Sequence, residues 1–452
     1  MLFASAPNGG AHGAPARERR GALGPPQATE PGSGAEPRSS MKYAILSFGC
    51  RTNQADSCDL ERHLRARGGE ETRIESADVV VVNTCAVTST AEQAARQAIR
   101  RVARLNPAAR VVATGCYAVR APSDLLGLTG LKPCYTISEV VAQSAELVAR
   151  GFSPANLSPL SGPGTRGRTL HLLRVQTGCD QRCTYCIVPA TRGRARSAPV
   201  GRVIDQVGDA VAAGFKEMMI TGVHLGCYGR DLQPAIGLAE LLHALAAHAP
   251  GVRFRLSAVE PMDFDDGVVG AVADGAHFAR HFHLPLQHAS DRILSAMARP
   301  YTLDRYRRVV GNLLDACPDA AIGTDLIVGF PGETNADFEA CVGYLDASPL
   351  AYVHVFPFSP RPGTAAAQMG GRPRGAEVRR RVQELRAVGA DLNRRFRRRF
   401  LGSVRDGLTI EDGTLVLTDN YLRVRIPAGL PRNERVRVKI AADGQPMTGD
   451  VG

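Results

Sequence analysis

Apolar positions follow two alternating patterns in the first third of the chain. Three nearly continuous apolar runs, at 43–49, 77–85 and 109–116, predict buried strands. Two longer segments between them, at 54–68 and 88–107, carry apolar residues at helical spacing. Because the strands alternate with helices and are apolar on both faces, this pattern predicts an α/β domain with a parallel sheet.

The same alternation resumes in a longer block from residue 169 to residue 400. It follows a segment at 151–168 that is rich in Pro, Gly and Ser and is therefore predicted to be a linker. Six apolar runs in the block predict strands, with helical segments between them: 170–177, 217–224, 253–259, 281–287, 321–330 and 352–358. About six such units predict a partial (β/α)6 barrel, in which chemistry lies at the carboxyl ends of the strands.

The last part of the chain predicts one long helix and then a small barrel. Apolar residues at helical spacing between 376 and 402 predict a helix that docks along one stripe: Val378, Val382, Leu385, Val388, Leu392, Phe396 and Phe400. Residues 404–444 instead alternate apolar and polar positions between turn signals. The segment 401–452 is therefore predicted to form a small C-terminal antiparallel β-barrel.

The first 40 residues show neither pattern. They are rich in Gly, Ala, Pro, Arg and Ser, a composition that predicts disorder. Met41 opens the first predicted strand, so either translation starts there or residues 1–40 form a basic arm that contacts RNA. The N-terminal α/β domain is then expected to span 41–150.

Charge and composition narrow the class of protein. The net charge of +11 is typical of proteins that bind nucleic acid, although an Arg-rich proteome gives the same bias. No apolar run reaches the roughly 18 residues of a membrane-spanning helix, and no secretory signal opens the chain. We therefore expect a soluble cytoplasmic protein whose 11 cysteines serve metal binding or catalysis rather than disulfides.

Three cysteines lie close together on the loop after the first predicted barrel strand. Cys179, Cys183 and Cys186, here called the barrel triplet, offer soft thiolates that select zinc, cuprous copper or an iron–sulfur cluster. A structural zinc site takes four ligands, and no fourth Cys or His stands nearby, since His171 precedes the strand. A cubane cluster on three thiolates leaves one iron open, and we favour it over three unrelated structural cysteines.

Three other cysteines each follow a predicted strand of the N-terminal domain. Cys50, Cys85 and Cys116, here called the edge triplet, are far apart in sequence. Parallel strands end along one edge of their sheet, so these thiols are expected to converge on a second cluster. The alternative is that small residues cap buried strands. The remaining cysteines are interpreted as structural: Cys58, Cys134, Cys227, Cys317 and Cys341.

The spacing of the barrel triplet, with the aromatic Tyr185 before its last cysteine, resembles the signature of radical S-adenosylmethionine enzymes. Blocks such as "GCRTNQADS", "NTCAVTSTAE" and "DLIVGFPGET" extend the resemblance to the methylthiotransferases over residues 41–448. The resemblance implies two [4Fe-4S] clusters and S-adenosyl-L-methionine as cofactors. It implies that the barrel triplet holds the radical cluster, that the edge triplet holds an auxiliary cluster, and that Tyr185 contacts the cofactor.

The reaction implied by this resemblance is the insertion of sulfur into an unactivated C–H bond, followed by methylation. One S-adenosylmethionine would methylate the sulfur and a second would generate the radical. The C-terminal barrel resembles the TRAM domain, an RNA-binding module. A reductant such as flavodoxin or ferredoxin and a sulfur donor are the implied partners.

Polar residues at the predicted strand ends are candidates for the cofactor site because of their position. Ordinary turn residues are the alternative interpretation. The candidates are Thr221, Gly222, Ser257, Glu260, Gln287 and the "GFPGE" turn. Arg192 and Arg194 follow the barrel triplet and are interpreted either as contacts to an anionic substrate or as a solvated basic turn.

Three branches of the family differ in substrate: isopentenyladenosine in tRNA, threonylcarbamoyladenosine in tRNA, and an aspartate of a ribosomal protein. The basic C-terminal barrel and the arginines at 394–399 favour an anticodon stem-loop of tRNA over a basic protein. Blocks such as "TGVHLGCYGRDL" resemble the threonylcarbamoyladenosine branch most, whereas "LPLQHASD" resembles the ribosomal-protein branch. An RNA-binding iron–sulfur sensor without turnover is the non-enzymatic alternative.

Overall fold

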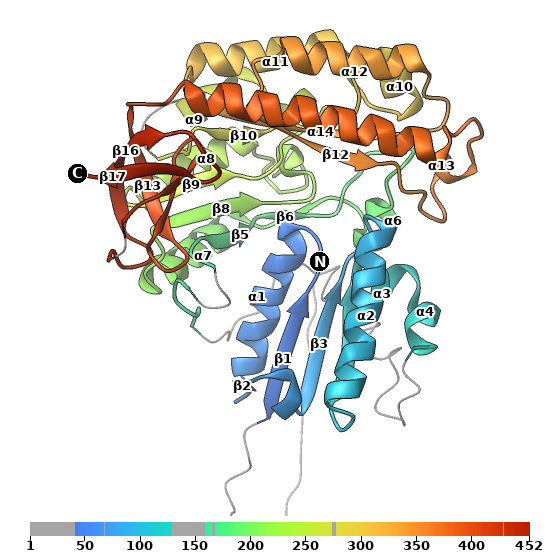
Figure 1. The fold of residues 1–452 in the computed structure, drawn as a ribbon. Coiled ribbons are helices and arrows are strands. Elements are labelled where there is room, and N and C mark those ends of the chain that lie inside the picture. Colours follow the sequence, from blue (N-terminus) through green and yellow to red (C-terminus); the bar gives the residue numbers. More distant parts are fainter. Residues whose placement is uncertain (1–40, 67, 129–158, 165–167, 274–276, 428) are drawn as a thin grey trace, which may run out of the picture. The chain divides into compact units, whose positions relative to one another are not determined.

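The computed structural model describes residues 41–66, 68–128, 159–164, 168–273, 277–427 and 429–452 (Figure 1). The predictions for residues 1–40, for most of the linker and for Cys134 lie outside these residues. Among the described residues, no helix combines the length and the apolar character needed to cross a bilayer.

A parallel four-stranded sheet in the order β2-β1-β3-β4 forms the N-terminal domain. Five of the six residues of β3 are buried, which is the burial expected of a strand covered on both faces. Helix α2 begins where the Thr88 hydroxyl accepts a hydrogen bond from the Ala91 N–H at 3.2 Å. In chain order the elements are β1 (Lys42–Ser47), α1 (Arg51–Ala66), β2 (Glu70–Glu71), η1 (Ile74–Ser76), β3 (Val79–Thr84), α2 (Ser89–Leu105), β4 (Arg110–Gly115), α3 (Cys116–Arg120) and α4 (Pro122–Leu126).

Six parallel strands form the central barrel, as the apolar runs predict. They pair as β5-β8-β9 and β10-β11-β12, and two parallel bridges, Phe254 to Phe278 and Ala258 to His283, join the two sets. No pairing between β12 and β5 closes the ring within the described residues, so the barrel is partial. The strands are β5 (His171–Arg174), β8 (Glu217–Thr221), β9 (Arg253–Leu256), β10 (His281–His283), β11 (Ala321–Val328) and β12 (Tyr352–Pro357).

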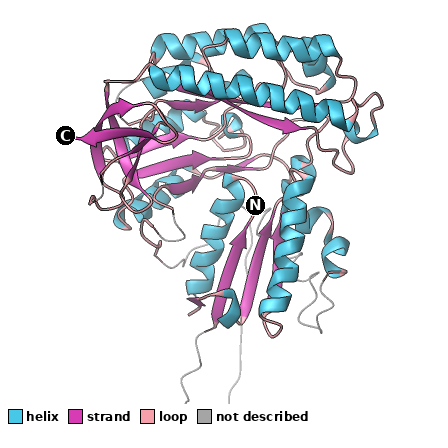
Figure 2. Ribbon diagram, viewed as in Figure 1, coloured by secondary structure: helices cyan, strands magenta, loops and turns pink. Residues whose placement is uncertain are grey.

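Helices separate the barrel strands, and apolar side chains of both kinds of element share one large core. Figure 2 shows this alternation of helix and strand. A short pair, β6 (Gln176–Thr177) and β7 (Arg196–Ser197), flanks the barrel-triplet loop. The helices are α6 (Val188–Arg192), α7 (Val200–Ala212), η3 (Leu225–Cys227), α8 (Leu238–His248), η4 (Pro261–Asp263), α9 (Asp266–Ala273), α10 (Asp291–Ala296), α11 (Leu303–Ala316), α12 (Asn335–Ala347), α13 (Ala365–Gln368) and α14 (Gly375–Arg398).

Helix α14 is the predicted long helix, and it runs beside β12 (Figure 1). Its predicted apolar stripe is the packed face, with Leu385, Leu392 and Phe396 almost fully buried. The final residues of the chain form a closed barrel in the order β13-β14-β15-β17-β16. Its strands are β13 (Val404–Ile410), β14 (Leu415–Thr418), β15 (Arg423–Arg425), β16 (Arg435–Ala442) and β17 (Met447–Val451).

The predicted small C-terminal antiparallel barrel is confirmed, with one parallel pair. Four of the five strand pairs are antiparallel, whereas β15 and β17 run parallel. The reason is geometric: strand directions cannot alternate all the way around a closed ring with an odd number of strands. The shortest strand of this barrel, β15, accepts the parallel neighbour.

A buried charge cluster joins the central barrel to the C-terminal barrel. Glu217 pairs with Arg253 at 2.7 Å and with Arg255 at 2.8 Å, and all three side chains are almost fully buried. Arg255 also donates to the backbone carbonyls of Thr418 and Asp419, each at 3.1 Å. Each buried charge is thus paired and hydrogen-bonded, as burial of charge requires.

One buried histidine predicts how stability depends on pH. His171 starts β5 and lies against the Phe215 ring, and burial lowers its pKa to about 4. The pKa of His171 is therefore lower in the folded protein than in the unfolded chain. As the pH falls below 6.5, His171 gains a proton in the unfolded chain before it does so in the folded protein. Between about pH 6.5 and pH 4 this residue is expected to lower the free energy of unfolding by about 3 kcal/mol.

Denaturant titrations at several pH values check this prediction. His171→Gln is expected to flatten the pH dependence in that window, whereas His243→Gln, at an exposed histidine, is expected to leave it unchanged. The same slope in wild type and His171→Gln would show that His171 does not carry the effect.

Candidate functional site

The edge triplet lies at the carboxyl edge of the N-terminal sheet. Cys85 and Cys116 directly follow β3 and β4, and Cys50 follows β1 after a short turn. A β-carbon built on Gly49, where φ is +99°, would lie only 2.4 Å from the β-carbon of Cys85. The turn before Cys50 therefore packs directly on Cys85, and only glycine fits there. The expected convergence of the three strand ends is confirmed by the parallel pairing.

Burial keeps two thiols of the edge triplet, Cys85 and Cys116, protonated in the absence of a cation. It raises the pKa of Cys85 to about 12, and the neighbouring Cys50 and Cys116 add to this shift. Burial also raises the pKa of Cys116, although the Arg192 guanidinium opposes it. Thiols become metal ligands as thiolates, so a cation at this edge would release their protons.

The barrel triplet lies on the loop between β6 and α6. Gly178, just before Cys179, has a φ of +72°, and a β-carbon there would lie 1.9 Å from the Arg194 carbonyl oxygen. The loop closes because the Cys186 N–H donates to the Cys183 carbonyl at 3.0 Å. Burial raises the pKa of Cys186 to about 12 and also raises the pKa of Cys183, so these two thiols are protonated without a cation.

Two polar partners of the barrel triplet are residues that the sequence did not single out. The Nδ1 atom of His224 lies 3.7 Å from Cys179 Sγ, and its Nε2 lies 2.6 Å from Asp263 Oδ2. Although burial opposes charge, the hydrogen bond to Asp263 raises the pKa of His224 to about 12. Arg299 donates to Cys183 Sγ at 3.1 Å and is itself buried. Both partners place positive charge beside sulfur atoms.

Four predicted cofactor residues have identifiable places around this loop. Glu260, after β9, forms an ion pair with Arg299. Tyr185 packs against a small apolar cluster that includes Phe330. Thr221 ends β8, where its carbonyl accepts the Val175 N–H, and the carbonyl of Gly222 accepts the Thr52 hydroxyl at 3.4 Å. Thr221 and Gly222 thus use their backbone carbonyls in hydrogen bonds that stabilise the fold.

The other two predicted cofactor residues, Ser257 and Gln287, each have a feature that is unusual for a residue with a purely structural role. The Ser257 hydroxyl is buried and has no hydrogen-bond partner among the described residues. Gln287 has a φ of +68°, a left-handed conformation that costs energy for a non-glycine residue. An unpaired buried hydroxyl and a strained residue at neighbouring strand ends are typical of a ligand site.

Arg192 fits neither interpretation made from the sequence. Its side chain is 1% exposed and is therefore neither solvated nor open to a substrate. It donates to Cys116 Sγ at 3.2 Å and to Asn53 at 2.9 Å, and it pairs with Asp56 at 2.7 Å. Arg192, from the barrel-triplet segment, therefore fixes the edge-triplet segment. Arg194, 92% exposed, matches the solvated basic turn.

This pair of arginines gives a matched stability test. Arg192→Met is expected to lower the free energy of unfolding by about 3 kcal/mol, because it removes one of the two buried arginine partners of the Asp56 carboxylate, Arg174 being the other, together with the hydrogen bond to Asn53. Arg194→Met is expected to change it by less than about 0.5 kcal/mol. Denaturant titration of both variants measures the difference, and equal effects would contradict the bridging role.

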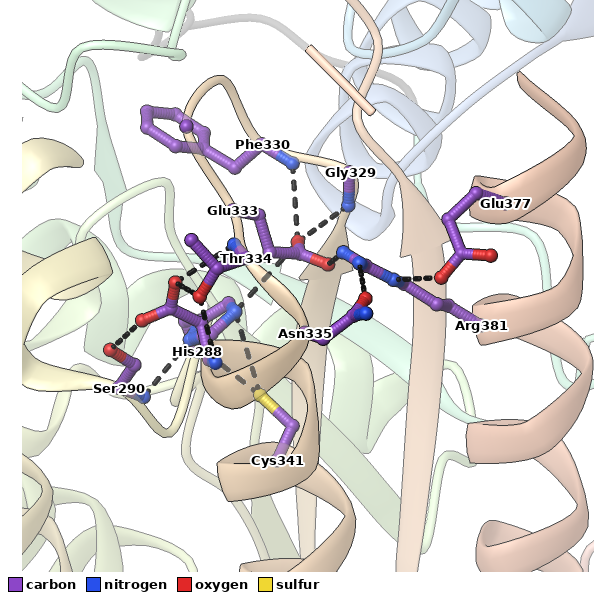
Figure 3. A network of polar contacts seen from close by, with 12 residues as sticks. His288, Ser290, Gly329, Phe330, Glu333, Thr334, Asn335, Cys341, Glu377 and Arg381 are labelled. Carbon is purple, nitrogen blue, oxygen red and sulfur yellow. Dashed lines mark hydrogen bonds and ion pairs between the residues drawn. The ribbon is translucent and has the colours of Figure 1, made fainter. Parts of the chain in front are cut away.

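The "GFPGE" turn after β11 holds its shape through a buried carboxylate, shown in Figure 3. Glu333 accepts the Gly329 N–H at 2.6 Å and the Phe330 N–H at 3.3 Å. Its other oxygen accepts from Arg381 of α14 at 2.5 Å. The strand-end turn is thereby tied to the long helix, so Glu333 is a positioning residue and not a free carboxylate.

The arginines at the end of α14 are engaged within the protein. Each of the five makes an ion pair or donates to a backbone carbonyl: Arg394, Arg395, Arg397, Arg398 and Arg399. This weakens their expected role in phosphate binding. Arg425 on β15 and Lys439 on β16 are exposed and make no ion pair within the described part of the chain.

The comparisons with known proteins agree with this geometry. Residues 42–132 match the family described as "Uncharacterized protein family UPF0004", and residues 173–345 match the "Radical SAM superfamily". The fold resembles that of the radical S-adenosylmethionine methyltransferase TsrM from Kitasatospora setae, with a TM-score of 0.52 at 16% identity over 73% of this chain and 77% of that chain.

Curated relatives match nearly the whole chain. The threonylcarbamoyladenosine tRNA methylthiotransferase MtaB of Aquifex aeolicus is 34% identical over 88% of this chain and 100% of its own length. The enzyme of that name from Bacillus subtilis is 31% identical over 88% of this chain and 97% of its own. The ribosomal protein uS12 methylthiotransferase RimO of Roseiflexus sp. is 33% identical over 80% and 84%.

A partial barrel with a Cys-x3-Cys-x2-Cys loop at its strand ends defines a radical S-adenosylmethionine enzyme. The chain belongs to the methylthiotransferase family of these enzymes, as a member of the MtaB type. Its cofactors are S-adenosylmethionine and iron–sulfur clusters.

Proposed function

We propose that this enzyme converts N6-threonylcarbamoyladenosine at position 37 of tRNA to its 2-methylthio derivative. The MtaB relatives, whose names give this substrate, support the proposal over most of the chain. The observation that carries it is the pair of three-thiol groups, each at the carboxyl edge of a parallel sheet. One reaction that needs both a radical and a sulfur site accounts for both groups.

We assign the radical cluster to the barrel triplet and the auxiliary cluster to the edge triplet. Three thiols match the donor preference of [4Fe-4S] clusters, and one iron of each is left for a non-protein ligand. When bound, the clusters and S-adenosylmethionine supply the electron, the carbon radical, the sulfur site and the methyl group. The chain's own residues bind these groups and hold them in fixed positions relative to one another.

Residues around the barrel triplet would orient the cofactor. The Ser257 hydroxyl is available as a hydrogen-bond donor or acceptor because no described residue uses it. The ion pair with Arg299 holds Glu260 in place, while Arg299 also donates to the Cys183 sulfur. Gln287 is held in its strained conformation by backbone hydrogen bonds to Asp325 and Ile327. Tyr185 offers an apolar ring face beside the loop.

Ser257→Ala tests this assignment. The KM for S-adenosylmethionine is expected to rise about 5- to 10-fold, the value of one hydrogen bond, while protein stability does not fall because the lost hydroxyl has no protein partner. As a control, Ser348→Ala removes a buried hydroxyl that donates to the Leu345 carbonyl at 2.9 Å. That variant is expected to lose about 1 kcal/mol of stability with no change in KM. An unchanged KM in Ser257→Ala would remove Ser257 from the cofactor site.

Exposed basic residues support the delivery of an RNA substrate. Arg425 and Lys439 face outward from the C-terminal barrel, where phosphate contacts are possible. A surface pocket of about 550 Å³ beside Cys179 has Arg194, Arg196 and Arg230 in its wall, although two aspartates also line it. We propose the division into a sulfur-site domain at 41–150, a radical domain at 169–400 and an RNA-binding barrel at 401–452.

The residues that resemble the ribosomal-protein branch do not favour that substrate. His288, in the divergent "LPLQHASD" block, is buried 3.8 Å from Glu333 and 3.6 Å from Cys341 (Figure 3). It therefore packs under the "GFPGE" turn instead of facing a substrate. The divergence is a change of internal packing, and the tRNA assignment stands on the remaining blocks.

Mass spectrometry of tRNA nucleosides from a strain lacking the gene tests the substrate. We expect 2-methylthio-N6-threonylcarbamoyladenosine to disappear, to return with the wild-type gene and to stay absent with a Cys183→Ala gene. If that nucleoside persists and methylthio-isopentenyladenosine or the modified uS12 aspartate is lost in its place, the enzyme belongs to another branch of the family. We further propose a cytoplasmic site of action with a flavodoxin- or ferredoxin-type reductant and a separate sulfur donor.

A further inference from the structure

Three potential metal ligands meet on neighbouring strands of the central barrel, apart from both cysteine triplets. They are His283 on β10, Asp325 on β11 and His354 on β12. One ligand atom from each lies within 4.8 Å of the other two. Because they stand on three adjacent, hydrogen-bonded parallel strands, the backbone fixes their relative positions more firmly than a loop would.

The distances between the ligand atoms match those around a bound metal ion. Asp325 Oδ1 lies 3.0 Å from His283 Nε2 and 3.2 Å from His354 Nδ1. A metal ion about 2.1 Å from each donor places neighbouring donors about 3.0 Å apart in an octahedron and about 3.4 Å apart in a tetrahedron. Both measured distances fall between these limits.

A half-buried tyrosine, Tyr352, orients the first histidine in the way that metal sites require. The Tyr352 hydroxyl lies 3.2 Å from His283 Nδ1 and 2.8 Å from His281 Nε2. If His283 Nδ1–H donates to the tyrosine oxygen, the Tyr352 O–H can donate onward to His281. That arrangement leaves the lone pair of His283 Nε2 facing Asp325 and His354, and such outer partners are typical of metal-bound histidines.

Among the ion pairs of the described residues, Asp325 has His283 and His354 as its partners. Within the described residues, the Asp325 carboxylate makes no ion pair with a lysine or an arginine. In a metal-free protein both imidazoles would have to donate to this one oxygen.

We propose that His283, Asp325 and His354 bind a divalent first-row transition metal ion. Two imidazoles and one carboxylate suit Zn²⁺, Fe²⁺, Co²⁺ or Mn²⁺, and the absence of thiolate ligands sets the site apart from iron–sulfur chemistry. The His354 side chain is 57% exposed, so solvent reaches the site. Three protein ligands leave coordination positions open for water or for an oxygen donor such as a carboxylate or a hydroxyl.

The site also adjoins the proposed cofactor region. The Gln287 N–H donates to the Asp325 carbonyl at 2.8 Å, so the strained strand-end residue and the metal ligand share one backbone contact. A small ligand that contacts both the cofactor and the metal ion would place its oxygen donor beside β11 and β12. The metal site itself does not depend on which tRNA nucleoside is the substrate.

Zinc binding by the full-length, cluster-loaded protein tests the proposal. The protein is treated with a mild chelator and titrated with Zn²⁺ by calorimetry, and bound zinc and iron are counted by mass spectrometry after gel filtration. We expect about one Zn²⁺ per chain with iron content unchanged. His354→Ala and Asp325→Asn are expected to weaken binding at least about 100-fold, and Tyr352→Phe about 10-fold, since it removes only an outer partner.

His243→Ala, which removes an exposed histidine on α8, is the matched control and is expected to bind zinc like wild type. His354 is half exposed, so its loss leaves the core intact, and circular dichroism verifies folding. Equal zinc affinity and stoichiometry in wild type and His354→Ala would overturn the proposal, as would wild type that binds no zinc.

Discussion

Replacing Cys183 by alanine is expected to abolish cleavage of S-adenosylmethionine and all product formation. With only two thiols left in the barrel triplet, the cluster that holds the cofactor is lost, and iron should fall from about eight to about four atoms per chain. Because the cofactors carry the difficult chemistry, we expect at least a roughly 1,000-fold loss of 5′-deoxyadenosine formation. Anaerobic assays with dithionite, together with iron analysis, measure both effects.

Cys58→Ser is the matched control for this experiment. Cys58 lies on α1, outside both triplets, and its sulfur accepts a hydrogen bond from Arg168 at 3.3 Å. That variant is expected to keep about eight iron atoms and near wild-type activity. Full cofactor cleavage by Cys183→Ala, or loss of iron in Cys58→Ser, would show that the cluster ligands are assigned wrongly.

Replacing Cys116 by alanine is expected to abolish sulfur insertion but not the cleavage of S-adenosylmethionine. The edge triplet loses its cluster, so sulfur insertion should fall at least about 1,000-fold, while 5′-deoxyadenosine is still formed within about threefold of the wild-type rate. Iron should again fall to about four atoms per chain. Arg192 keeps its contacts to Asn53 and Asp56 in this variant, so the two domains stay joined.

The contrast between the two variants is the informative result. If Cys116→Ala stops cofactor cleavage as completely as Cys183→Ala does, the clusters do not act separately. If Cys116→Ala still makes the methylthio product, the edge triplet is not the sulfur site. Cofactor cleavage and modified nucleoside are measured in the same reaction mixture.

The cluster sites were largely predictable from the sequence because their geometry follows from the strands. Cys85 and Cys116 end apolar runs that can only be buried parallel strands, and parallel strands end at one edge. The barrel triplet needs no long-range information at all, since its spacing is local. These predictions rest on backbone topology, which hydrophobic patterns encode well.

The residues that support these sites could not be predicted from the sequence in the same way. Arg192 lies within a motif, but its burial against Asp56 and Cys116 depends on how the two domains pack. Arg299 stands in no recognised motif and reaches Cys183 across 116 positions of sequence. Long, flexible side chains can point in many directions, so tertiary packing decides their partners.

The same limit applies to the histidine–aspartate site. His283 and His354 lie in apolar runs that the sequence shows only as strands, and Asp325 interrupts another. Their convergence depends on the register of β10, β11 and β12, because a shift by one residue would point each side chain to the opposite face. Strand pairing partners and register are not fixed by local sequence.

The arginines near the chain's end show a further limit of a prediction from sequence. Five arginines at 394–399 were interpreted as a phosphate-binding face, but each has an internal partner, with Arg397 and Arg398 both paired to Asp443. A charge count from sequence cannot separate charges that are neutralised by the fold from those that are free. Within the described residues, Arg425 and Lys439 on strands of the C-terminal barrel are exposed cations without an ion pair.

The most direct test of the central claim is an anaerobic reaction of the reconstituted enzyme with two purified tRNAs. One carries N6-threonylcarbamoyladenosine and the other N6-isopentenyladenosine, and both receive S-adenosylmethionine, sulfide and dithionite. The account predicts 5′-deoxyadenosine together with 2-methylthio-N6-threonylcarbamoyladenosine from the first tRNA and no methylthio product from the second. Methylthiolation of the isopentenyladenosine tRNA alone, or no 5′-deoxyadenosine with either tRNA, would contradict it.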